Sequence, residues 1–147
     1  ILLLRYPEKF TYYFEVHEEV ENAVIFPFLI QVFVENAAKH ALTLEKVPLI
    51  SVTVYPEDRG DEKYVNIYIS DTGNGFPEET LQRLKAGEDS SEHGKHIGIE
   101  NCLKRFHYYY GDSGEIHFDN SPLGGAIVDI HIPYRTGGEE HETIARG

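Results

Sequence analysis

The sequence predicts a two-layer α/β sandwich of the α+β class, in which helices cover one face of a mixed, mostly antiparallel sheet. Two observations support this fold: β-rich runs come in pairs, as at 49–55 and 63–70, and helical segments lie between the pairs. The regular alternation of strand and helix that builds a doubly wound nucleotide fold is absent. We expect the 147 residues to form one domain, with its core over about 5–134 and a polar, frayed tail over 135–147.

Composition excludes several classes of protein. A hydrophobic content of 41% and a charged content of 26% are typical of a globular protein. No apolar run reaches the ~18–20 residues that cross a bilayer, and the formal charge of −12 argues against nucleic acid as a partner. The single cysteine, Cys102, excludes an internal disulfide and is expected to be an ordinary buried thiol. The chain begins without methionine or a signal peptide, and we expect it to be a piece of a longer protein.

The first elements are a strand and a helix. Residues 10–16 alternate, which predicts a strand, and the polar residues 17–24 are expected to be a connection. Pro27 suits the first turn of a helix that runs to about Leu42. The apolar residues expected on one face of the strand are Phe10, Tyr12, Phe14 and Val16.

The helix over 27–42 has two unlike sides. A broad apolar side suits packing on a sheet and consists of Ile30, Phe33, Val34, Ala37, Ala38 and Ala41. The other side begins with Phe28, Leu29 and Val32 and ends with Glu35, Asn36, Lys39 and His40. These four polar residues form either a solvated helix end or a site with oxygens for a cation and bases for phosphates. The helix alone leaves both interpretations open.

The remaining elements follow from turn formers and apolar periodicity. Two strands are expected to flank an exposed loop, and a later pair of strands closes the fold. The helix after the long polar loop has Ile99, Leu103 and Phe106 on one face. In chain order we expect a strand over 49–55, a loop over 56–62, a strand over 63–70, a turn over 71–77, a helix over 78–85, a mobile loop over 86–96, a helix over 97–110, and strands over 115–118 and 126–132.

Two glycine-containing segments carry candidate site residues. Asp71 leaves a strand and is followed by Gly73 and Gly75, which is either an ordinary turn or a fixed carboxylate for an exocyclic amine beside glycines that admit a flat ring. The second segment contains Gly94, Lys95 and Gly98 at the start of a helix. It is either a flexible loop or a phosphate site that uses free backbone N–H groups and the helix dipole.

Four stretches in this order resemble a known family. They are FPFLIQVFVENAAKHA, ISDTGNGFP, GKHIGIENCLKRF and GGAIVDIHIP. They are similar to the N, G1 and G2 boxes and the last strand of the ATP-binding domain of histidine kinases, within the gyrase, Hsp90, histidine kinase and MutL superfamily. Pro27 and the segment from Ile97 are most similar to LytS/YesM-like bacterial sensor kinases. The resemblance covers about residues 5–134 and implies the Bergerat ATP-binding fold.

The resemblance implies roles for the matching residues. Asn36 would be a Mg²⁺ ligand with Lys39 and His40 near the phosphates, and Glu35 would position a water or metal. The carboxylate of Asp71 would accept from the adenine amine. The residues implied to shape the adenine pocket or to flank and charge the phosphate-covering loop are Gly73, Gly75, Gly94, Lys95 and Gly98.

The favoured function is that of a protein-histidine kinase catalytic domain, which binds Mg·ATP and transfers the γ-phosphoryl group to a histidine on a phosphoacceptor helix that is not visible in this sequence. Val32 stands where ATPases of the superfamily often carry a general-base carboxylate, which favours a kinase over an ATPase-type conformational switch. His96 stands where a third glycine is common, and it is the main support for a third hypothesis, a non-catalytic nucleotide-binding or interaction module.

The resemblance also implies partners and a location. The partners would be ATP, the phosphoacceptor domain of the full-length chain, a response regulator of a two-component system, and a second copy in a full-length homodimer. The location would be the cytoplasmic part of a membrane-anchored bacterial sensor.

Overall fold

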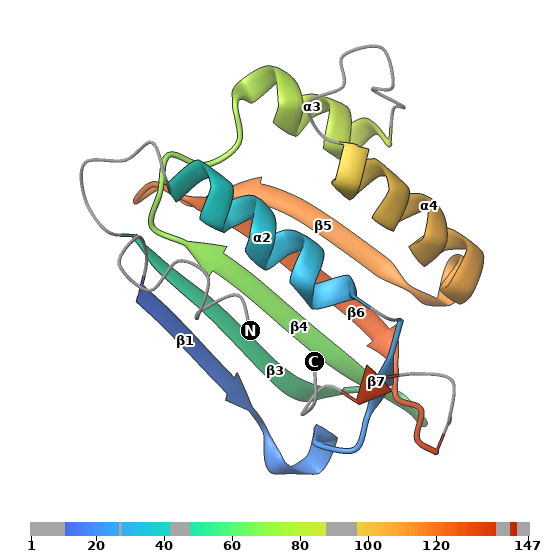
Figure 1. Ribbon diagram of the computed structural model, residues 1–147. Helices are drawn as coiled ribbons and strands as arrows, with labels where there is room; N and C mark the ends of the chain where they lie inside the picture. The colour runs from blue at the N-terminus through green and yellow to red at the C-terminus, as the bar shows by residue number, and fades with distance from the viewer. Residues whose placement is uncertain (1–10, 27, 42–47, 88–96, 138–141, 144–147) are drawn as a thin grey trace.

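The computed structural model describes residues 11–26, 28–41, 48–87, 97–137 and 142–143. Five strands form one sheet in the order β1-β3-β4-β6-β5 (Figure 1). β1 pairs with β3 in parallel, and the three other pairs are antiparallel. The predicted mixed, mostly antiparallel sheet is therefore confirmed. The strands are β1 (Thr11–Val16), β3 (Leu49–Arg59), β4 (Glu62–Asp71), β5 (Glu115–Asn120) and β6 (Ala126–Pro133).

Three helices lie on one face of this sheet, as Figure 1 shows. They are α2 (Leu29–Ala41), α3 (Glu78–Ala86) and α4 (Ile97–Tyr110). Each lies within two residues of its predicted bounds. Pro27 and Leu42, the two ends predicted for the first helix, lie outside the described residues. None of the helices that the structure describes is long and apolar enough to span a membrane.

The core lies between the helices and the sheet. Alternate residues of each strand point toward the helices, as the period of two requires. On α4, the predicted face is confirmed, because Ile99 and Phe106 are buried and Leu103 packs against the core. The buried strand residues include Ile50, Val52, Val54, Val65, Ile67, Ile69, Val128, Ile130 and Ile132.

The hairpin between β3 and β4 is longer than predicted. Residues 56–62 were expected to form an exposed loop, but the two strands stay paired as far as Arg59 and Glu62 and turn through Gly60, whose φ is +64°. Pro56 is tolerated because β1 pairs with β3 only as far as Val54, so this end of β3 lies at an open edge of the sheet. The loop was predicted because these residues are charged. A hairpin at the edge of a sheet also carries charged side chains, so the charges do not distinguish the two structures.

Three further expectations need correction. The segment 17–24 is not only a connection, because it contains a 3₁₀ turn, η1 (Glu18–Val20), and the start of β2 (Val24–Ile25). The tail contains β7 (Glu142–Thr143), which pairs antiparallel with β2, so the prediction of a frayed tail is wrong at these two residues. Backbone pairing of this kind needs no apolar pattern in the tail. Leu29 was placed on the polar side of its helix but is fully buried, because α2 packs against α4 as well as the sheet.

Candidate functional site

Three of the predicted site segments meet at one end of the molecule. The carboxyl-terminal end of α2, the carboxyl-terminal end of β4 and the amino-terminal end of α4 all lie at the same end of the sandwich (Figure 1). α2 contacts both β4 and α4 along this layer. The fold therefore brings together segments that are as far apart in the sequence as Ala41 and Ile97.

The polar side of α2 is at least partly accessible where the structure describes it. Glu35 and Asn36 are partly buried, and Lys39 is exposed. The Glu35 carboxylate accepts a hydrogen bond from the Gln31 amide at 3.1 Å, one turn earlier. His40 lies in the last turn of α2, but its side chain is outside the described residues. The helix thus presents an amide and a base at this end of the sheet.

Asp71 is held by backbone donors from two segments. Its Oδ1 accepts from the N–H of Gly73 at 2.8 Å and from the N–H of Ala126 at 3.4 Å. The first bond closes a tight turn directly after β4, and the second ties that turn to the start of β6. The carboxylate is therefore fixed in place by the fold and is only partly buried.

Glycines allow the two segments to approach each other this closely. Gly125 has φ +94°, and a Cβ on it would lie 1.7 Å from the backbone oxygen of Asp71. Gly75 has φ +78°, and a Cβ there would lie 2.6 Å from Oδ1 of Asn120. Both positions require glycine for its conformation and for space.

The β5–β6 hairpin contributes to this site, which the sequence did not predict. Residues 119–125 were treated only as a connection, yet Asn120, Gly125 and Ala126 all contact the turn that follows β4. The pair of adjacent glycines, Gly124 and Gly125, was the available signal, because both have positive φ.

The phosphate-side residues are only partly described. Gly98 is exposed in the first turn of α4, and a Cβ there would meet nothing within 4 Å. Packing within the described chain therefore does not require glycine at this position. Gly94 and Lys95, together with most of the predicted loop over 86–96, lie outside the described residues.

The described residues form neither a preformed metal cluster nor a reactive cysteine site. Within the part of the chain that the structure describes, no group of three or more His, Cys, Asp or Glu side chains could hold a metal ion. Cys102 is buried, as predicted, and burial raises the pKa of its thiol to about 11. The thiol is therefore protonated at neutral pH and is not a nucleophile.

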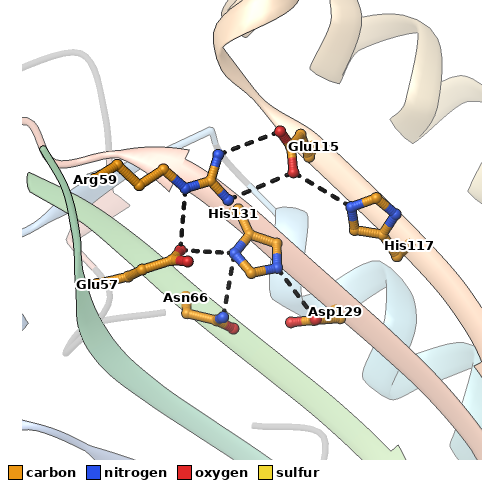
Figure 2. A network of polar contacts seen from close by, with 7 residues as sticks. All are labelled: Glu57, Arg59, Asn66, Glu115, His117, Asp129 and His131. Carbon is orange, nitrogen blue, oxygen red and sulfur yellow. Dashed lines mark hydrogen bonds and ion pairs between the residues drawn. The ribbon is translucent and has the colours of Figure 1, made fainter. Parts of the chain in front are cut away.

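A second polar cluster lies on the face of the sheet opposite the helices. Figure 2 shows His131 between two carboxylates, with Nδ1 2.8 Å from Glu57 and Nε2 3.1 Å from Asp129. Arg59 joins Glu57 to Glu115 through ion pairs of 3.5 and 3.2 Å. Asn66 of β4 lies with its Nδ2 3.2 Å from Nδ1 of His131, so that the contacts together link four of the five strands of the sheet. We call this set of residues the open-face network, and its members are Glu57, Arg59, Asn66, Glu115, His117, Asp129 and His131.

The open-face network shifts the pKa of several members. Hydrogen bonds from His131 to Glu57, and from Arg59 to Glu115, hold the pKa of both carboxyls below 4.5. Burial by itself would lower the pKa of His131, but its hydrogen bonds to Glu57 and Asp129 raise it above 6.5 on balance. The network therefore stabilises the imidazolium form of His131.

The chain is similar in sequence to one family of proteins along most of its length. Residues 25–136 match the family described as histidine kinase-, DNA gyrase B-, and HSP90-like ATPase. The sensor protein LytS of Enterococcus faecalis is 33% identical over 142 residues, which are 97% of this chain and 23% of that protein. The sensor histidine kinase/phosphatase LytS of Staphylococcus aureus is 32% identical over 137 residues, which are 92% of this chain and 23% of that protein. The chain thus spans less than a quarter of these relatives.

Solved structures show the same fold. The nucleotide-free catalytic domain of histidine kinase ThkA superposes with a TM-score of 0.64 at 20% identity, covering 92% of this chain and 90% of that chain. Full-length ShkA in complex with AMPPNP superposes with a TM-score of 0.62 at 17% identity, covering 93% of this chain and 28% of that chain. At these identities the likeness establishes the architecture and not the site.

Proposed function

The chain belongs to the histidine kinase-, DNA gyrase B- and HSP90-like ATPase family, and from this premise we propose that it binds Mg·ATP as the catalytic domain of a LytS-type sensor histidine kinase. The observation that carries the proposal is the fixed carboxylate of Asp71, which two backbone N–H groups hold at the end of β4. This end of β4 lies at the same end of the sandwich as the carboxyl-terminal end of α2 and the start of α4 (Figure 1). Of the neighbours with this fold, ShkA was solved with an ATP analogue.

The adenine end of ATP is assigned to the turn after β4. The Asp71 carboxylate accepts a hydrogen bond from the exocyclic amine, while Gly73 and Gly75 let the backbone approach the ring. Gly98 at the start of α4 faces the phosphate chain, where unpaired backbone N–H groups and the helix dipole favour negative charge. The fold does not require glycine at position 98, which supports a role toward a ligand. Gly94 and Lys95 are assigned to the same phosphate end from the sequence.

Magnesium is assigned to the polar end of α2. The described residues contain no ready-made cage of carboxylates, which fits an ion that enters with the nucleotide and takes few protein ligands. Asn36 supplies an amide oxygen for it, Lys39 and His40 supply positive charge near the phosphates, and Glu35 positions a water. When bound, the ion neutralises charge on the phosphate oxygens.

The reaction assigned to this domain is phosphoryl transfer. A nitrogen of a histidine on a phosphoacceptor segment outside this chain forms a bond to the γ-phosphorus, the bond to the β-phosphate oxygen breaks, and ADP leaves. Positioning and electrostatic stabilisation carry such a transfer. The full-length protein is assigned as a membrane-anchored homodimer that passes the phosphoryl group to a response regulator, with this domain in the cytoplasm.

Isothermal titration with ATP and ADP, with and without Mg²⁺, tests the binding assignment. We expect both nucleotides to bind and Mg²⁺ to strengthen ATP binding. Asn36→Ala should abolish the effect of Mg²⁺, whereas Asn22→Ala, which removes an exposed amide before β2, should retain it. An Asn36→Ala protein with an unchanged Mg²⁺ effect would remove Asn36 from the site.

Phosphoryl transfer is tested separately by adding a phosphoacceptor segment of LytS in trans. Acid-labile, alkali-stable label from γ-labelled ATP on the segment is the expected result. Nucleotide binding with release of inorganic phosphate and no labelled segment would instead support an ATPase-type switch, and no binding would support a non-catalytic module.

A further inference from the structure

Asn120 forms two hydrogen bonds with the backbone of a single residue in the turn after β4. Its Oδ1 accepts from the N–H of Phe76 at 2.8 Å, and its Nδ2 donates to the C=O of Phe76 at 2.8 Å. Because one partner is a donor and the other an acceptor, the orientation of the carboxamide is determined by the contacts themselves. The side chain therefore pairs with Phe76 as a neighbouring strand would.

This pairing lies at the end of the proposed adenine segment, directly after Gly75. Asn120 is also close enough to Gly75 that a Cβ on the glycine would lie 2.6 Å from Oδ1. The turn is thus held at both ends by the β5–β6 hairpin: Ala126 donates to Asp71 at its start, and Asn120 brackets Phe76 at its finish. The path of the backbone between these two points is set by side-chain and backbone contacts from a different part of the chain.

The ring of Phe76 continues the connection into the helical layer. It is 6% exposed and lies edge-on to Phe118, with centroids 6.0 Å apart. Phe118 in turn contacts Phe33 at 5.9 Å, and Phe33 precedes Asn36 by three residues on α2. A displacement of Phe76 would therefore disturb contacts that reach both proposed ends of the nucleotide site.

We propose that Asn120 is a positioning residue for nucleotide binding. It acts through the backbone of Phe76 and so positions Gly73, Gly75 and the carboxylate of Asp71. Asn120 does not contact the nucleotide itself. This inference rests on the proposed function of the Asp71 segment. It predicts that losing the carboxamide weakens nucleotide affinity while leaving the transfer step at saturating ATP unchanged.

Two variants and one control test this role. Asn120→Ala removes both hydrogen bonds and should weaken ATP and ADP binding about tenfold. Asn120→Asp keeps the acceptor for the Phe76 N–H but places a carboxylate oxygen against the Phe76 C=O, so it should also weaken binding. In the nucleotide-free protein, the Phe76 amide should exchange with deuterium faster in Asn120→Ala than in wild type. Asn66→Ala is the control, because Asn66 is another strand asparagine, 5% exposed, in the open-face network. It should lower the urea midpoint but leave ATP affinity unchanged.

The outcomes separate this inference from the function on which it rests. Equal ATP affinity in wild type and Asn120→Ala would overturn the positioning role and leave the proposed function standing. An equal loss of ATP affinity in Asn66→Ala would show that general destabilisation of the protein causes the loss. That result would also overturn the positioning role of Asn120. Absence of nucleotide binding in the wild-type chain would overturn the proposed function, and the positioning role with it. If Asn120→Ala does not fold, the comparison between Asn120→Asp and wild type decides in the same way.

Discussion

Asp71 accepts two backbone N–H groups through Oδ1, and its carboxylate is the group predicted to accept the adenine amine. Asparagine at this position keeps an oxygen for the N–H groups of Gly73 and Ala126 but replaces the second oxygen with an NH₂ group, which donates. We expect Asp71→Asn to weaken ATP binding by at least about tenfold, because a donor then faces a donor. Calorimetry measures the affinity, and urea unfolding checks that the midpoint stays close to wild type. Equal ATP affinity in the variant would refute the adenine assignment.

Gly125 provides a prediction about stability rather than binding. A Cβ at Gly125 would overlap the backbone oxygen of Asp71, and its φ of +94° adds strain, so Gly125→Ala should cost more than about 3 kcal/mol. Gly87 is a matched control, because it has φ +70° but open space around it. Gly87→Ala should cost only about 1 kcal/mol. Urea unfolding of both variants measures the difference, and similar costs would show that the close approach to Asp71 is not rigid.

The start of α2 has an unusual conformation. Phe28 has φ +65° and is 53% exposed. Its carbonyl oxygen accepts a hydrogen bond from the backbone N–H of Val32 at 3.1 Å. A side chain in this conformation costs about 1 kcal/mol, which glycine avoids. The first turn of this helix therefore stores strain in a residue that contributes little burial.

A pair of substitutions at Phe28 tests this strain. Phe28→Gly should be more stable than Phe28→Ala by about 1 kcal/mol in urea unfolding. The same pair at exposed Gln31, inside the helix, should show the opposite order, because alanine is favoured there by about 1 kcal/mol. Alanine as the more stable residue at both positions would contradict a strained start of α2.

The open-face network connects β3, β4, β5 and β6 and links the stability of the whole sheet to pH. The pKa of His131 is raised above 6.5, so its contribution is complete below pH 6.5 and is lost as pH rises through the folded-state pKa. The pKa values of Glu57 and Glu115 are lowered below 4.5, so their contributions are complete above pH 4.5 and are lost as pH falls through the folded-state values. The network is therefore most stabilising between pH 4.5 and 6.5.

Urea unfolding across pH 4.5 to 8.5 measures this dependence. The free energy of unfolding of the wild type should fall as pH rises above about 6.5, and this fall should be smaller in His131→Gln. His107→Gln, on the exposed side of α4, is the control and should retain the wild-type fall. An unchanged profile in His131→Gln would show that the imidazolium pairs contribute nothing measurable to stability.

Several features were determined by the sequence alone. Alternating apolar residues and helical periodicity identified the sheet and three helices, because burying one face requires that pattern in each element. The order of the four motifs identified the family, and Asp71, Asn36 and Gly98 were placed on the elements where the structure has them. These are properties of local segments, which neighbouring residues in the chain largely decide.

The tertiary structure decided the parts that depend on distant contacts. Asn120 bonds to Phe76 across 44 residues, and Ala126 to Asp71 across 55. In the local sequence, Asn120 is only a polar residue before a turn. Its pairing cannot be predicted from that segment, because the backbone group that it bonds to belongs to a distant part of the chain. Likewise, residues 56–59 remain in a strand because β4 pairs with them, although their charges suggest a loop. Long-range pairing leaves no pattern in the local sequence from which it could be predicted. This pairing gives the candidate site its geometry.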